Sequence, residues 1–117
     1  MFNYYMNVII KPRTKLDIPN IAVCIESAFK NYEKVIFIFD LTETSIFNFQ
    51  SLVRILPLLK RFDKEIETKL EKSYIILKEA WKKNLLLLFF SYYEPKKPVE
   101  FAKEMPQNQG FNSSVLL

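Results

Sequence analysis

The apolar positions along the chain predict alternating strands and helices. Residues 4–10 are rich in aromatic and β-branched side chains and are followed by Pro12, which favours a first strand that ends there. From Asp17, which can cap a helix, apolar residues recur at intervals of three and four up to Tyr32 and predict a helix. Residues 35–39 form an unbroken apolar run, typical of a strand covered on both faces. We therefore expect this run to be the central strand.

The second half of the chain repeats the alternation. Asn48 can cap a helix whose apolar positions run to Leu59, with a kink or break at Pro57. The pattern resumes as far as Leu70, so the segment is either one bent helix or two shorter ones. Residues 74–77 predict another buried strand. A third helix and a short edge strand follow. The apolar stripe predicted for that helix is Trp81, Leu85, Leu88, Phe89 and Tyr92, and the edge strand spans residues 99–102.

This order predicts a single small α/β domain at residues 1–105, with a mostly parallel sheet of four to five strands and helices packed on it. A chain of 117 residues that is 50% apolar suffices for one such core. Residues 105–114 are polar and rich in turn formers. We therefore expect residues 106–117 to be a loosely ordered C-terminal tail.

Composition excludes several kinds of chemistry. The chain contains no histidine, and Gly110 is its only glycine, so neither a histidine-dependent catalytic site nor a glycine-rich phosphate loop can be written. Cys24 is the only cysteine, which excludes a disulfide framework and a CxxC metal site. The net charge of +4 is spread among interleaved acids and bases, which argues against nucleic-acid binding. We predict no cofactor and no metal.

The loop after the central strand suggests a separate hypothesis, a phosphotransferase. Residues 40–44, DLTET, directly follow the central strand, and this DxxxT looks like the nucleophile loop of haloacid-dehalogenase phosphotransferases. That chemistry also requires an acidic pair for magnesium, and the acids after Leu77 include no adjacent pair. We therefore expect Asp40 to bind the amides of its own loop, and we predict a protein that is not an enzyme.

The middle of the chain resembles STAS domains, the family of anti-sigma-factor antagonists and of cytoplasmic modules of anion transporters. The resemblance covers residues 34–56, KVIFIFDLTETSIFNFQSLVRIL. In STAS domains a buried strand leads into a D-S-[ST]-G motif that opens a helix and can carry a phosphorylation switch. That motif falls on residues 48–51, which places Gln50 where the family has its phosphorylatable residue. The resemblance implies a STAS-like protein-interaction module that lacks the phosphoswitch serine.

The interaction surface that follows from this hypothesis lies at the start of the second helix, where unpaired backbone amides favour a polar partner. Its predicted partner-binding residues are Thr44, Ser45, Asn48, Phe49, Gln50 and Ser51. The partner would be another protein, or a second copy of the chain that pairs through the edge strand at residues 99–102.

An alternative resemblance points to lipids. Residues 35–101 look like the carboxyl half of CRAL-TRIO lipid-exchange domains, especially residues 72–101, KSYIILKEAWKKNLLLLFFSYYEPKKPVEF. This implies a small lipid-binding or membrane-surface protein with Trp81, Lys82 and Lys83 as membrane contacts. At this length most apolar side chains are needed for the core, so we expect little room for a full-sized pocket.

The expected location is cytoplasmic. A single cysteine is typical of a reducing compartment, and residues 1–11 lack the basic region and long apolar core of a secretory signal. The apolar run at residues 85–90 is much shorter than a bilayer span.

Overall fold

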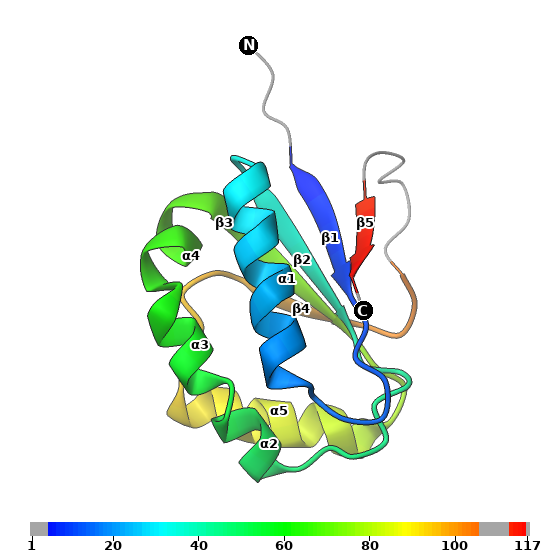
Figure 1. The fold of residues 1–117 in the computed structure, drawn as a ribbon. Coiled ribbons are helices and arrows are strands. Elements are labelled where there is room, and N and C mark those ends of the chain that lie inside the picture. Colours follow the sequence, from blue (N-terminus) through cyan, green and yellow to red (C-terminus); the bar gives the residue numbers. More distant parts are fainter. Residues whose placement is uncertain (1–4, 106–112, 117) are drawn as a thin grey trace.

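The computed structural model describes residues 5–105 and 113–116. Within them the chain forms an α/β domain with one parallel sheet (Figure 1). The strands are β1 (Met6–Ile10), β2 (Val35–Asp40), β3 (Leu70–Ile76), β4 (Val99–Ala102) and β5 (Ser113–Leu116). The helices are α1 (Ile18–Asn31), α2 (Phe49–Val53), α3 (Leu56–Arg61), α4 (Asp63–Lys69) and α5 (Ala80–Tyr92).

The sheet has the order β4-β3-β2-β1-β5, and every neighbouring pair is parallel. The predicted fold class is confirmed, and β2 is the central strand. Register places Phe37 of β2 between Val8 of β1 and Ser73 of β3, and Ser73 in turn opposite Val99 of β4. Residues in register project on the same side of a sheet, so this row crosses a single face.

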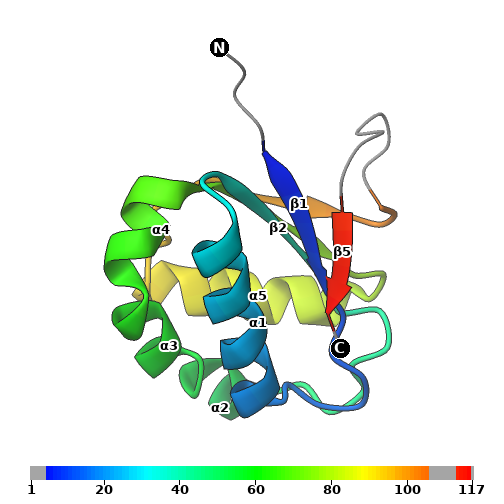
Figure 2. The same cartoon turned by 45° about the horizontal axis from the view of Figure 1, so that its top comes forward.

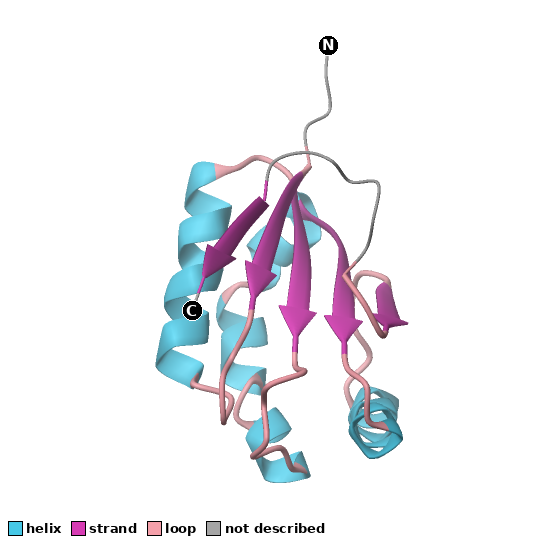
Figure 3. Ribbon diagram, turned by 90° about the vertical axis from the view of Figure 1, so that its right-hand side faces the viewer, coloured by secondary structure: helices cyan, strands magenta, loops and turns pink. Residues whose placement is uncertain are grey.

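The helices occupy two positions relative to the sheet. Helix α1 and the α2–α4 segment pack on one face, whereas α5 runs beneath the carboxyl ends of the strands (Figures 1 and 3). The core is correspondingly divided into two apolar clusters. One joins α1 to the sheet through residues such as Val8, Ile25 and Phe37, and the other surrounds α5 through Leu52 and Phe89.

Local sequence signals explain most element boundaries. Asp17 caps α1 by accepting a hydrogen bond from the backbone N–H of Asn20, and Asn48 caps α2 in the same way. Pro57 lies in the first turn of α3, where a missing N–H costs no helical bond. Of the two alternatives predicted at Pro57, a kink or a break, the structure has a break, which lies at Arg54 and Ile55 just before α3. A second break at Phe62 divides the segment into three short helices, where one bent helix or two shorter ones were expected.

The strand predicted at residues 74–77 begins earlier than its apolar run. Strand β3 begins at Leu70, which is buried in the core, and it pairs with β2 from that residue onward. The prediction that helical periodicity extends through Leu70 is wrong there. Glu71 and Lys72 concealed the strand, because they interrupt the apolar pattern while their backbone continues the ladder.

The apolar stripe predicted for the third helix is also wrong in part. Trp81 is 51% exposed and Tyr92 is 70% exposed, whereas the buried side chains of α5 are Lys82, Leu86 and Phe89. Because residues 85–90 are all apolar, helical spacing alone does not identify which side of α5 faces inward.

Two further predictions concern the edges of the sheet. The predicted edge strand is β4, which lies at one edge, and Figure 2 shows β5 beside β1 at the other. Of the tail predicted at residues 106–117, the structure describes only β5, whose residues pair in parallel with Asn7 to Ile10 of β1. The remainder of that tail lies outside the described residues.

Candidate functional site

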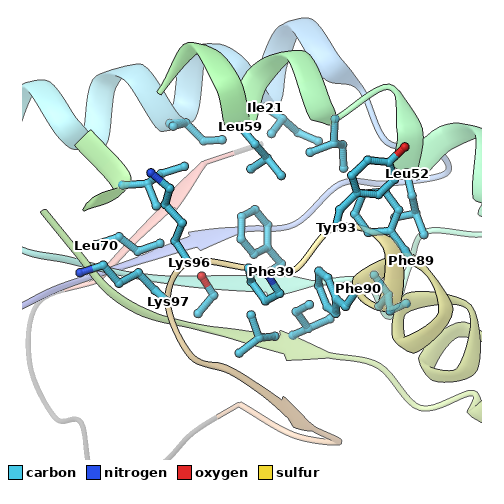
Figure 4. Close-up of a pocket in the computed structure, with 18 of the residues that line it drawn as sticks. Ile21, Phe39, Leu52, Leu59, Leu70, Phe89, Phe90, Tyr93, Lys96 and Lys97 are labelled. Carbon is cyan, nitrogen blue, oxygen red and sulfur yellow. The ribbon is translucent and has the colours of Figure 1, made fainter. Parts of the chain in front are cut away.

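An apolar cavity of about 420 Å³ lies where the two core clusters meet. It is bordered by the helical face of the sheet, by α1, by the α2–α4 segment, by α5 and by the loop after α5, and it is open to solvent on one side (Figure 4). Its volume falls within the range of about 300–1,000 Å³ typical of ligand pockets. The apolar lining residues include Ile21, Ile25, Phe39, Leu52, Ile55, Leu59, Ile66, Leu70, Ile75, Leu86, Phe89, Phe90 and Val99.

Helix α5 forms one border of the cavity. It lies across the strand ends (Figures 1 and 3), and its residues Leu86, Phe89 and Phe90 line the cavity. There it braces α2, since the ring of Phe49 packs edge-on against Phe89 at a centroid distance of 5.9 Å and against Tyr92 at 6.3 Å. These aromatic contacts hold α2 and α5 together beside the cavity.

The two ends of the cavity differ in charge. Figure 4 shows Lys96 and Lys97 near Leu70 at one end, and Leu52, Phe89 and the phenol ring of Tyr93 at the opposite end. Ser73 contributes a hydroxyl, and it is the only polar residue among the described strand residues that line the cavity. Its backbone N–H donates to the carbonyl of Pro98 at 3.0 Å, which places Ser73 beside the loop that carries the two lysines.

An ion-pair cluster fastens this loop to α4. The ammonium of Lys96 lies 2.7 Å from the carboxylate of Asp63 and 3.2 Å from that of Glu67. The hydrogen bond to Asp63, and then the one to Glu67, raise the pKa of Lys96 above its ordinary value of 10.5. We name these three residues the clasp. It joins the α5–β4 loop to α4 at the charged end of the cavity.

The predicted partner-binding residues lie together before and within α2, but not all of them are available. The hydroxyl of Thr44 is fully buried and donates to the carbonyl of Pro12 at 2.8 Å, which ties this loop to the end of β1. Phe49 packs on α5. Thr44 and Phe49 therefore act in the fold, while Ser45 and Gln50 remain exposed.

The side chain of the capping residue Asn48 also forms its hydrogen bonds within α2. Oδ1 of Asn48 accepts hydrogen bonds from the backbone N–H of Ser51 at 2.8 Å and from its hydroxyl at 2.9 Å. Helix α2 has only five residues, so its dipole is small. Capping thus accounts for both Asn48 and Ser51.

The carboxylate of Asp40 has the environment expected from the sequence. Its Oδ1 accepts hydrogen bonds from the N–H of Thr42 at 3.0 Å and from the Thr42 hydroxyl at 2.6 Å, and Oδ2 lies 3.9 Å from the ammonium of Lys11. These contacts fix the loop after β2.

The burial of Lys82 was not predicted from the sequence. Lys82, which the sequence grouped with membrane contacts, is 1% exposed and donates to the carbonyl of Leu41 at 3.0 Å. Its ammonium also lies 3.3 Å from the carboxylate of Glu79. The membrane role predicted for Lys82 is therefore wrong, whereas Trp81 and Lys83 are exposed.

From the sequence we expected little room for a ligand cavity, although one feature of the sequence indicated such a cavity. The run at residues 85–90 supplies more apolar side chains than a single buried helix face can use, and a pair of lysines follows it.

Among the described residues, no group of three or more histidine, cysteine or acidic side chains is placed to hold a metal ion. No helix in the described ranges is long and apolar enough to cross a membrane.

Comparison of the chain with models of known protein families, with characterised proteins and with solved structures gives no match. The resemblances to STAS and CRAL-TRIO domains therefore stay predictions, and the proposals below depend on the geometry.

Proposed function

We propose that this protein binds a single-chain apolar ligand, such as a lipid acyl chain, in the cavity between the sheet and its helices. The observation that carries the proposal is a hollow of about 420 Å³ with an almost entirely apolar lining. Closely packed interiors contain few voids larger than a water molecule, so an apolar space of this size in a small domain favours a ligand.

Energetics support a chain-like ligand. Each methylene group moved from water into an apolar site contributes about 0.8 kcal/mol, so several buried methylenes suffice for appreciable affinity. The cavity is bordered by α5 and, at its charged end, by Asp63 and Lys96 of the clasp. This accords with the CRAL-TRIO alternative, in which the protein binds a lipid without chemical change.

The test is titration with a neutral ligand, because a neutral ligand reports the cavity alone. Binding of dodecanol would be measured by calorimetry, and binding of Nile red by fluorescence. Ile75 lines the cavity from β3, so Ile75→Phe should weaken binding about tenfold or more through the loss of roughly two buried methylenes.

Ile36→Phe provides the matched control. Ile36 is a partly buried isoleucine of the adjacent strand β2, one position before Phe37 and therefore on the opposite face of the sheet. Its enlargement should leave binding unchanged. Absence of dodecanol and Nile red binding to a folded wild-type chain, or equal binding by the Ile75→Phe variant, would overturn the proposal.

We propose protein contact through the loop before α2 as a second function, as the STAS resemblance implies. The observation that favours it is Ile46, which is 52% exposed between the exposed Ser45 and the buried Phe47. The tested partner is a second copy of the chain, and sedimentation would measure self-association. Ile46→Asp should abolish a dimer and Gln50→Arg should weaken it, whereas a wild-type chain that is monomeric at its highest soluble concentration would contradict this proposal.

A further inference from the structure

We infer that the ligand is an anionic amphiphile, of the class of long-chain carboxylates, bound with its head group at Lys97 and its tail toward Phe89. This inference rests on the proposed function and adds to it the chemistry and orientation of the ligand. It is carried by the unequal charge of the cavity ends.

Two lysines, Lys96 and Lys97, lie at the polar end of the cavity (Figure 4). Lys60, Lys96 and Lys97 all line the cavity, and the acidic residues that line it are Asp63 and Glu94. Lys96 is already paired in the clasp with Asp63 at 2.7 Å and with Glu67 at 3.2 Å, so its charge is compensated. Of the two lysines at this end, Lys97 is therefore the one that remains for an anion.

Lys97 is the lysine best placed to receive the head group. Its side chain is partly buried, whereas those of Lys60 and Lys96 are exposed. No carboxylate of residues 5–105 forms an ion pair with it, in contrast to Lys96. A partly desolvated ammonium gains more from an incoming carboxylate than a fully hydrated one.

Ser73 supplies a second polar contact on the inner side of this end. It faces the cavity from β3, and its N–H is bonded to Pro98, the residue after Lys97. A hydroxyl can donate to a carboxylate oxygen while the lysine neutralises its charge. Toward the other end, the lining includes Leu52, Phe89 and the phenol ring of Tyr93, none of which offers a positive charge to a carboxylate.

The experiment compares dodecanoate with dodecanol, which share a tail and differ in the head group. The wild type should bind dodecanoate about tenfold more tightly than dodecanol, the effect of one charge-assisted hydrogen bond. Lys97→Gln should remove that preference by weakening only the carboxylate. Lengthening the tail by one methylene should tighten binding about fourfold in both series until the cavity is full.

Lys64→Gln is the matched control, because Lys64 is an exposed lysine of α4 next to Asp63 that does not line the cavity. It changes net charge equally and should preserve the preference. Equal affinities of the two ligands for wild type, or an unchanged preference in Lys97→Gln, would overturn the head-group assignment while leaving the cavity proposal intact. Binding of neither ligand would instead overturn the proposed function itself.

Discussion

The ammonium of Lys82 donates a hydrogen bond to the backbone carbonyl of Leu41 at 3.0 Å, although both residues are buried. This bond crosses from the first turns of α5 to the loop that follows β2. A second contact, to Glu79 at 3.3 Å, compensates the charge locally. The bond therefore fixes the end of α5 that lies farthest from Tyr92, and so it helps to keep this helix across the strand ends.

Replacement of Lys82 by methionine should destabilise the protein. Methionine keeps most of the aliphatic stem but leaves the carbonyl of Leu41 without its donor, so the free energy of unfolding should fall by about 2 kcal/mol. Urea denaturation measures this change, and Lys78→Met, at an exposed lysine of the preceding loop, is the control. Unaltered or increased stability of Lys82→Met would mean that the cost of burying the ammonium offsets the bond.

Thr44 provides a second prediction, which separates a structural residue from a partner-binding one. Its buried hydroxyl bonds the carbonyl of Pro12, so Thr44→Val keeps the shape of the side chain but should cost about 1–3 kcal/mol. Thr44→Ser retains the hydroxyl and loses one methyl group, at a cost of about 1 kcal/mol. Thermal or urea unfolding would compare the pair. If the serine variant were the less stable of the two, packing rather than the hydrogen bond would dominate at this position.

The alternation of strands and helices was predictable because it depends on patterns that are local in sequence. The run at residues 35–39 predicted β2, and the caps at Asp17 and Asn48 predicted α1 and the first residues of α2. Strand β3 was shortened because Glu71 and Lys72 conceal backbone pairing that only the neighbouring strand reveals. The inward side of α5 was not predictable, because residues 85–90 are apolar on every side of the helix and do not indicate a direction until the neighbouring elements are placed.

The cavity lies beyond sequence reasoning for a related reason. Whether Leu86 and Phe89 fill the core or border a space depends on where α5 crosses the sheet, which is a tertiary property. The charged pair Lys96–Lys97 was visible in the sequence, but its position at one end of that space was not. Similarly, Lys82 looks like its exposed neighbour Lys83 until the carbonyl of Leu41 is placed beside it.

The thiol of Cys24 should be unreactive in the native protein. Cys24 is buried on α1, and desolvation raises the pKa of its thiol above the ordinary value of 9.0. At about pH 8 a thiol reagent should therefore label the folded chain slowly and the urea-unfolded chain rapidly. The chain has no other cysteine, so the label has a single target. Rapid labelling without urea would show that α1 opens locally or that the side chain is accessible.

The same shift predicts a dependence of stability on pH. A group whose pKa is raised by folding contributes stability that is fully present below its unfolded pKa, here 9.0, and that is lost as pH rises through the higher folded value. Cys24→Ser shares the site but does not titrate in this range. The difference in unfolding free energy between wild type and this variant should therefore shrink as pH rises above 9, and a constant difference would contradict the assignment.

The clasp should control how fast a ligand leaves the cavity. Lys96 joins the α5–β4 loop to Asp63 and Glu67 of α4, so the double variant Asp63→Asn, Glu67→Gln releases the loop while keeping the lysine. Release of Nile red into excess lipid vesicles, followed by stopped-flow fluorescence, should become about two- to fivefold faster, the effect expected for loss of exposed ion pairs. A neutral probe keeps the head-group site out of this measurement.

High salt and high pH should both weaken the ion pairs of the clasp. About 1 M salt screens exposed charges and should accelerate release from the wild type but not from the double variant. Because its carboxylate partners raise the pKa of Lys96 above 10.5, the clasp should persist through the ordinary lysine range and weaken only as pH rises through the higher value. Glu100→Gln is the control, since it breaks the exposed pair with Lys72 at 3.1 Å, neither of whose residues lines the cavity. Release as slow in the double variant as in wild type would place the exit elsewhere, away from the α5–β4 loop.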